Sequence, residues 1–117
     1  MKVKLIVLLK SKDILAKVGE ISFQDGLTGY RVYKNISNIN KELENFDNFI
    51  KTLIEKYGEK QVDGSMKVVK YKDEYNKSLQ PILEEEVEIE ITKINPKTLG
   101  GLSPFEIMGI EWMLEQE

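Results

Sequence analysis

The chain has 117 residues, of which 41% are hydrophobic and 32% are charged, and its formal net charge is −3. This length predicts one domain, residues 1–117, with a single core, and the mixed composition excludes an intrinsically disordered chain. Cysteine and histidine are absent, which excludes disulfides, thiol nucleophiles, Cys/His zinc sites and any Ser-His-Asp triad. We therefore expect a non-enzymatic protein without metal or other cofactor.

Charge is unevenly distributed along the chain. Residues 1–17 carry five Lys against one Asp, whereas residues 81–117 carry nine Glu against two Lys. We expect the two ends to attract each other within the folded chain. A basic surface for nucleic acid is disfavoured, because the lysines are dispersed and only one Arg is present.

The first element, residues 2–10, starts with Lys2 and Lys4 between apolar residues and continues as an apolar run. This pattern predicts a strand that enters the core. No small-residue cleavage site follows, so a signal peptide is disfavoured. No apolar run approaches the roughly 18 residues of a membrane span. A short helix is expected next, from an N-cap at Ser11 to about Ser22, followed by a loop over residues 24–29.

The strongest pattern in the chain predicts a long helix that begins between Gly29 and Ile36 and ends at Tyr57. Its apolar residues alternate at intervals of four and three, and we call them the seam: Val32, Ile36, Ile39, Leu43, Phe46, Ile50, Leu53 and Tyr57. Gly58 stands where a left-handed C-terminal cap is expected. The helix would be about 40 Å long, more than a compact domain of this size needs. Alternatively, residues 30–33 form a short strand that pairs with residues 21–23.

The width of the seam predicts where a partner binds. Between Ile36 and Asp47 the seam positions are the only apolar ones, so the apolar stripe is narrow, which suits contact with a single partner helix. Phe49 and Ile54 widen it further along, so we expect the C-terminal half to contact the main core. The predicted partner-binding residues, for a second copy of the chain or for another protein, are Val32, Ile36, Ile39, Leu43 and Phe46.

The second half of the chain alternates strands and helices. Residues 66–71 predict a lysine-rich strand, and residues 73–83 a helix capped by Asp73 and limited by Pro81. Residues 86–94 alternate Glu with β-branched residues, which predicts a strand whose acidic face pairs with Lys2 and Lys4.

The last segment has the pattern of a capped helix. Residues 103–106, Ser-Pro-Phe-Glu, form a capping box with Pro at the first helical position. The apolar residues of this helix are Phe105, Ile107, Ile110, Trp112, Met113 and Leu114. Together the elements predict an α+β fold, with a mainly antiparallel sheet of about three strands packed against one long helix and two or three shorter ones.

The acidic run at residues 84–90 has two interpretations. Strand alternation separates Glu86, Glu88 and Glu90 by about 7 Å, which is too far for all three to bind one small ion. A solvated or lysine-paired sheet face is the favoured interpretation. A mimic of nucleic-acid phosphates remains the alternative.

The order of these pieces resembles a family of small uncharacterised proteins encoded by phages and prophages of Gram-positive bacteria. The matching features are Tyr-x-x-x-Lys-Asn at 30–35, the acidic long helix, Glu-Lys-Tyr-Gly-Glu-Lys at 55–60, Asp-Gly at 63–64, Glu-Glu-Glu-Val-Glu-Ile at 84–89 and Leu-Ser-Pro-x-Glu at 102–106. The resemblance implies a phage protein in the cytoplasm of an infected or lysogenic bacterium. It implies no reaction, ligand or catalytic residue.

These observations lead to three functional hypotheses. The first is a phage accessory protein that acts by protein contact, for example as an inhibitor of a host defence or another host factor. The second is a virion or tail-assembly component. The third is a small-ligand or nucleotide-binding protein.

Overall fold

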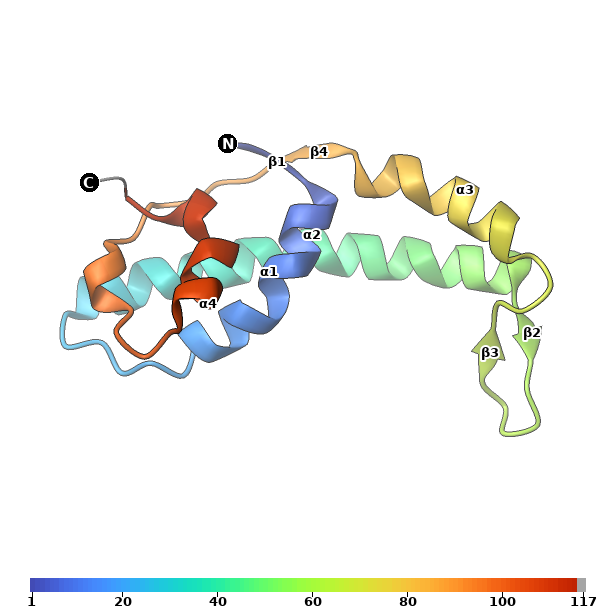
Figure 1. The fold of residues 1–117 in the computed structure, drawn as a ribbon, viewed down its shortest axis with the longest axis horizontal. Coiled ribbons are helices and arrows are strands. Elements are labelled where there is room, and N and C mark those ends of the chain that lie inside the picture. Colours follow the sequence, from blue (N-terminus) through green and yellow to red (C-terminus); the bar gives the residue numbers. More distant parts are fainter. Residues whose placement is uncertain (116–117) are drawn as a thin grey trace.

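The computed structural model describes residues 1–115 and has an α+β fold, which confirms the predicted class (Figure 1). In chain order the elements are β1 (Lys2–Lys4), α1 (Leu5–Val18), α2 (Gly26–Tyr57), β2 (Glu59–Lys60), β3 (Met66–Lys67), α3 (Lys72–Leu83), β4 (Glu86–Glu88), the 3₁₀ turn η1 (Pro96–Thr98), α4 (Pro104–Gly109) and the 3₁₀ turn η2 (Glu111–Met113). The expected sheet of about three strands is instead two antiparallel pairs, β1 with β4 and β2 with β3. Within the described residues, no helix is both long and apolar enough to cross a membrane.

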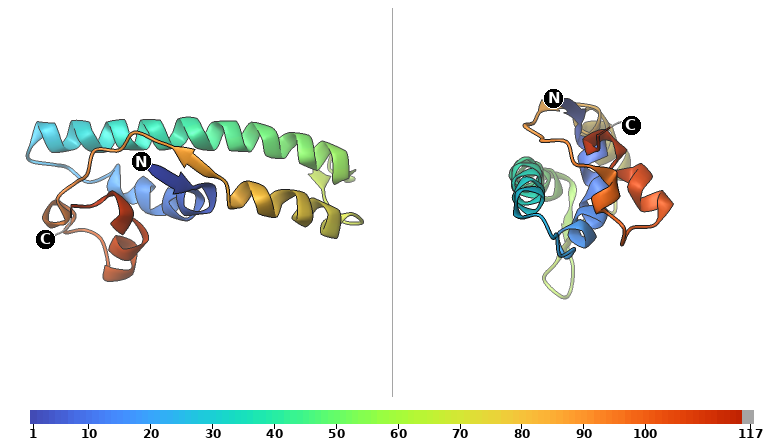
Figure 2. Two further views of the ribbon diagram at one scale, coloured as in Figure 1. Left: turned by 90° about the horizontal axis from the view of Figure 1, so that it is seen from above. Right: turned by 90° about the vertical axis from the view of Figure 1, so that its left-hand side faces the viewer.

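Helix α2 runs along the length of the molecule (Figure 1). We call its N-terminal half, with α1, α4 and residues 89–115, the body; its C-terminal half, with α3 and the β2–β3 hairpin, is the arm (Figure 2). The molecule measures 50 × 30 × 23 Å, and its radius of gyration is 17.1 Å. A compact chain of this length would have a radius of gyration of roughly 13 Å. The projecting arm accounts for the difference.

Helix α1 replaces most of the first predicted strand. The prediction is wrong beyond Lys4, because α1 begins at Leu5. Its buried residues recur at helical spacing: Leu5, Leu8, Ser11, Leu15 and Val18. A short apolar run suits a buried strand and a buried helix equally, so periodicity alone does not separate them. Ser11, predicted as an N-cap, is therefore a buried residue in the middle of α1.

Ser11 joins α1 to the C-terminal segment through its hydroxyl group. The hydroxyl donates a hydrogen bond to the Val7 carbonyl at 2.8 Å and accepts one from Trp112 Nε1 at 3.0 Å. The Gly109 carbonyl lies 3.3 Å from the same oxygen. Ser11 is completely buried, so this contact lies inside the body and connects residues about a hundred positions apart in the chain.

Ser11→Ala is expected to lower the free energy of unfolding by about 1 kcal/mol. The Trp112 N–H loses its acceptor, which costs about 1–2 kcal/mol, and the better helix propensity of alanine offsets about 0.5 kcal/mol. Urea denaturation followed by the fluorescence of the single Trp measures the change. The exposed Ser22→Ala is the control and should stay within about 0.5 kcal/mol of the wild type. Equal midpoints for both variants would contradict the role of Ser11.

Helix α2 starts earlier than expected and ends where predicted. Asp25 caps it, accepting hydrogen bonds from the Leu27 amide at 3.1 Å and the Thr28 hydroxyl at 2.9 Å. The helix therefore begins at Gly26, and the alternative strand at residues 30–33 is wrong. The end at Tyr57 is confirmed. Gly58 is extended (φ −92°, ψ 165°) rather than left-handed; glycine suits this position because a Cβ atom would overlap the Ile54 carbonyl oxygen.

The core of the chain lies along the N-terminal half of α2. Val32, Ile39 and Leu43 are buried in the body, in one cluster with residues of α1 and the C-terminal segment. In the arm beyond Leu43, by contrast, Leu53 is the one buried apolar residue among those described. The expectation that Phe49 and Ile54 anchor the C-terminal half in the main core is therefore wrong. Phe49 is half-exposed, and this half of the helix packs on α3 instead.

The predicted pairing of the acidic segment with the first lysines is confirmed. In the β1–β4 ladder Lys2 lies opposite Glu88 and Lys4 opposite Glu86. The terminal ammonium group contacts Glu88 at 2.7 Å, and Lys4 Nζ contacts Glu84 at 2.9 Å. Lys17 pairs in addition with Glu106. The basic and acidic ends of the chain therefore attract each other as expected, with Glu84 paired to Lys4 and Glu88 to the terminal ammonium group.

The strand predicted for residues 86–94 ends at Glu88. Beyond it the chain continues along α2, and side-chain amides of the helix bind its backbone. Asn35 Nδ2 donates to the Thr92 carbonyl at 2.8 Å, while the Thr92 amide donates to Asn35 Oδ1 at 2.9 Å. Asn38 Nδ2 donates to the Glu90 carbonyl at 2.9 Å. Two asparagines thus satisfy backbone groups that a neighbouring strand would otherwise satisfy.

The arm contains the remaining predicted elements. The strand expected at residues 66–71 is shorter, and only Met66–Lys67 pairs with Glu59–Lys60. The helix expected at residues 73–83 is confirmed as α3, and Pro81 lies inside its last turn. The predicted cap is wrong, because the helix begins at Lys72 and Asp73 lies within its first turn. No residue of α3 is buried. Because the arm consists of two helices and a small hairpin, it has too few layers to enclose a core of its own.

The capping box of the last helix is confirmed. The Glu106 amide donates to Ser103 Oγ at 3.2 Å, and the Ser103 amide donates to Glu106 Oε1 at 3.0 Å. The hydrogen bond with Lys17, followed by that from the Ser103 amide, lowers the pKa of Glu106. The α-helix is shorter than expected, because α4 ends at Gly109 and η2 contains Trp112 and Met113.

Candidate interaction surface

The five predicted partner-binding residues do not form an exposed surface. Val32, Ile39 and Leu43 are buried in the body, and Ile36 and Phe46 are partly buried against the same core. The seam of the body already has its partners in α1 and the C-terminal segment. Of these five residues, Val32 and Ile36 also line a groove at the surface, so a surface for another protein would include only the edge of the seam.

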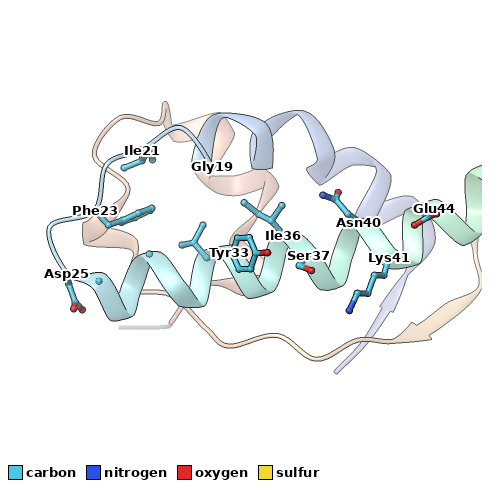
Figure 3. Close-up of a pocket in the computed structure, with 13 residues that line it drawn as sticks. Gly19, Ile21, Phe23, Asp25, Tyr33, Ile36, Ser37, Asn40, Lys41 and Glu44 are labelled. Atoms are coloured by element: carbon cyan, nitrogen blue, oxygen red, sulfur yellow. The ribbon is translucent and has the colours of Figure 1, made fainter.

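A groove lies beside the seam, between α2 and the segment that joins α1 to α2 (Figure 3). Its volume is about 580 Å³, which is within the range of roughly 300–1,000 Å³ that ligand sites have. The joining segment contributes Gly19, Ile21, Phe23 and Asp25, and α2 contributes Gly26, Gly29, Val32, Tyr33, Ile36, Ser37, Asn40, Lys41 and Glu44.

Apolar side chains from both walls face each other across this groove. Ile21 and Phe23 lie on the joining segment, and Ile36 lies opposite them on α2 (Figure 3). All three are partly buried against the core cluster, so their positions are fixed by packing. Tyr33 lies on the same wall, one turn before Ile36, and 69% of its surface is exposed (Figure 3). An apolar side chain that entered the groove would contact a formed apolar floor and an exposed aromatic ring.

Polar and charged residues form the rest of the groove lining. Asp25 lies at one end, whereas Ser37, Asn40, Lys41 and Glu44 extend along α2 (Figure 3). The hydrogen bonds from the Thr28 hydroxyl and then from the Leu27 amide lower the pKa of Asp25, so this carboxylate is ionised at neutral pH. Two carboxylates against one ammonium group give the lining a net negative charge, which disfavours phosphate and favours a basic ligand.

Catalytic constellations are not evident in this groove. Asp25 is the N-cap of α2 and its carboxylate already accepts two hydrogen bonds. Within residues 1–115, no group of three His, Cys, Asp or Glu side chains is placed to hold a metal ion. The Ser78 hydroxyl and then Lys56 lower the pKa of Tyr57, but this contact joins α2 to α3 in the arm, and none of these residues lines the groove.

Two of the five predicted partner-binding residues, Val32 and Ile36, line the groove. The wall formed by residues 19–25 was not predicted, although the sequence contains a signal for it. Residues 21–23 and 30–33 were expected to pair as strands if they were not parts of helices. The structure does bring Phe23 and Tyr33 together, with Phe23 on a loop and Tyr33 on a helix (Figure 3). An exposed Tyr within an amphipathic helix, opposite an alternating Ile-Ser-Phe segment, was the available indication.

Comparisons of the chain with protein-family models, with curated proteins and with solved structures found no match.

Proposed function

We propose that this chain is a non-enzymatic protein that binds another protein through the groove between α2 and residues 19–25. The observation that carries the proposal is the apolar floor of Ile21, Phe23 and Ile36 next to the exposed ring of Tyr33. Aromatic residues at the edge of a formed apolar pocket are typical of protein interfaces. A partner segment would place an apolar side chain on this floor.

The charge of the lining narrows the chemistry of the partner. Asp25 and Glu44 are acidic and Lys41 is the basic residue between them. A partner segment with Lys or Arg next to its apolar anchor would complement both carboxylates. The family resemblance implies a phage protein, so we propose that the chain is a phage accessory protein that binds and inhibits a host factor.

A pull-down with two matched variants tests the groove. Tyr33→Asp and Tyr30→Asp make the same substitution at neighbouring exposed positions of α2, where the side chains are 69% and 59% exposed. Tyr33 lines the groove, whereas Tyr30 does not. From a lysate of a Gram-positive bacterium, the wild type and Tyr30→Asp should capture the same protein, and Tyr33→Asp should lose at least about 90% of it, as expected for an interface aromatic.

Two outcomes of that experiment would contradict the proposal. One is equal capture by Tyr33→Asp and by the wild type, which would place the contact elsewhere. The other is the absence of any protein that the wild type and Tyr30→Asp both retain. Equal melting temperatures of the two variants establish that a loss of capture does not come from unfolding.

A small ligand is the second candidate, and the volume of the groove, about 580 Å³, favours it. The net negative lining favours a cationic apolar compound over a nucleotide. A thermal-shift screen separates the candidates, since a ligand of the groove should stabilise the wild type and not Tyr33→Asp. The third candidate, a virion or tail-assembly component, would co-purify with finished phage particles.

A further inference from the structure

A second surface lies on the other side of α2, around Phe49. This side chain is 49% exposed, although it belongs to a helix face that borders the core. Next to it is a hollow of about 200 Å³ lined by Leu5, Glu42, Asn45, Phe46, Phe49 and Ile82. At about 100° per residue, Phe49 and Tyr33 are roughly 160° apart around α2. The Phe49 surface is therefore independent of the groove.

A surface that carries both a half-exposed ring and an apolar hollow is complementary to the same surface on a second copy of the chain. In an interface with twofold symmetry the same patch occurs on both subunits, so Phe49 of each copy could fill the hollow of the other. The apolar residues of that hollow, Leu5, Phe46 and Ile82, come from α1, α2 and α3. The site is thus built where the arm joins the body, and its volume of about 200 Å³ leaves room for an inserted side chain.

The charges on this face determine how two copies can align. Residues at alternating intervals of three and four along α2 share the face of Phe49: Glu42, Asn45, Phe49, Thr52 and Lys56. Glu42 and Lys56 lie seven residues before and after Phe49, about 10 Å along the helix in each direction. An antiparallel pair centred on Phe49 places each Glu42 opposite Lys56 of the other copy, whereas a parallel pair places like charges together.

The neighbouring structure permits this antiparallel alignment. In a pair centred on Phe49, the last residue of one α2, Tyr57, lies opposite Lys41 of the other. The backbone of Glu90, bound by Asn38, covers the face of α2 just beyond that point. The second helix therefore ends before it would meet this segment. The Thr52 hydroxyl donates to the Phe49 carbonyl at 2.6 Å, so this group already has a partner and needs none in the interface.

We propose that two copies of the chain associate antiparallel across α2, with Phe49 of each copy in the hollow of the other and Glu42 paired with Lys56. The Lys56 ammonium now lies 5.2 Å from the centre of its own Tyr57 ring, and its flexible side chain can turn towards Glu42 of the second copy. This arrangement covers the exposed face of the arm, which has little core of its own.

Sedimentation velocity over a range of about 1 µM to 1 mM tests this association. The wild type should change from monomer to dimer within that range, and Phe49→Asp should weaken the dimer at least about tenfold, because a carboxylate would enter an apolar hollow. Phe105→Asp is the control, since Phe105 is 84% exposed on α4 and does not line this hollow. A wild type that stays monomeric, or a dimer unaffected by Phe49→Asp, would overturn the proposal.

Charge reversal tests the antiparallel alignment without replacing an apolar side chain. Glu42→Lys alone and Lys56→Glu alone should each weaken the dimer several-fold at low salt, and the double variant should restore it, because opposite charges again face each other. Failure of the double variant to restore the dimer would overturn the alignment. Because the groove lies elsewhere on α2, these variants should still bind a partner through Tyr33, so the two proposals can fail separately.

Discussion

Ile39→Asp is expected to unfold the chain rather than to abolish an association. Ile39 is completely buried in the body, and its replacement removes apolar contacts worth about 2–4 kcal/mol. It also places a carboxylate in the core at a further cost of several kcal/mol. The sum approaches the whole stability of a typical domain, about 5–15 kcal/mol. Far-UV circular dichroism and urea denaturation measure the result.

Two further variants make this experiment specific. Asn48→Asp introduces the same residue at an exposed position of the same helix and should change stability by less than about 0.5 kcal/mol. Ile39→Val removes one methylene group and should cost about 1 kcal/mol while the chain stays folded. If Ile39→Asp remained as stable as Asn48→Asp and lost only its binding to a partner, the seam would be a contact surface after all.

Asn35→Leu is expected to lower the free energy of unfolding by about 2–3 kcal/mol. The leucine cannot reproduce the two hydrogen bonds between the Asn35 amide and the backbone of Thr92, and each unsatisfied group costs about 1–3 kcal/mol. Part of that loss is offset by the better helix propensity of leucine. Urea denaturation gives the magnitude, and hydrogen exchange at the Thr92 amide should become much faster in this variant.

Asn35→Asp adds a test that depends on pH. The ionised carboxyl group accepts from the Thr92 amide but repels the Thr92 carbonyl, and only the protonated form can donate to that oxygen. Burial and this repulsion should raise the pKa of the new carboxyl group in the folded chain. The deficit relative to the wild type should therefore shrink as the pH falls below the raised folded-state pKa. A stability deficit of Asn35→Asp that does not change with pH would contradict this role of Asn35. So would an equal loss of stability in Asn35→Leu and in the control Asn48→Leu.

The parts of the fold that could be predicted from the sequence are those with local physical causes. The capping box at Ser103 is formed by residues three positions apart, so its hydrogen bonds depend on little else. The end of α2 follows from the end of the apolar pattern at Tyr57, directly before Gly58. The Lys/Glu register of β1 and β4 follows from alternation along two short segments.

The parts that could not be predicted depend on contacts between distant residues. Ser11 has the appearance of an N-cap, and its buried position becomes evident only with Trp112 beside it. Likewise, the local pattern does not distinguish Asn35 from an exposed polar residue of the helix, because its partner, the backbone of Thr92, is 57 residues away. The seam was interpreted as a partner surface because the sequence does not show that α1 covers it.

Thiol labelling is the most direct test of the central claim, which is that the centre of the seam, at Val32, Ile39 and Leu43, is buried in the core and that contacts with other molecules involve exposed side chains such as Tyr33. The chain contains no cysteine, so single cysteines can be compared without background. The cysteine of Ile39→Cys should be alkylated at least about a hundredfold more slowly in the native chain than in urea, because it reacts only through opening of the structure. The cysteine of Tyr33→Cys should react within about threefold of its rate in urea. Comparable native rates for the two variants would contradict the account.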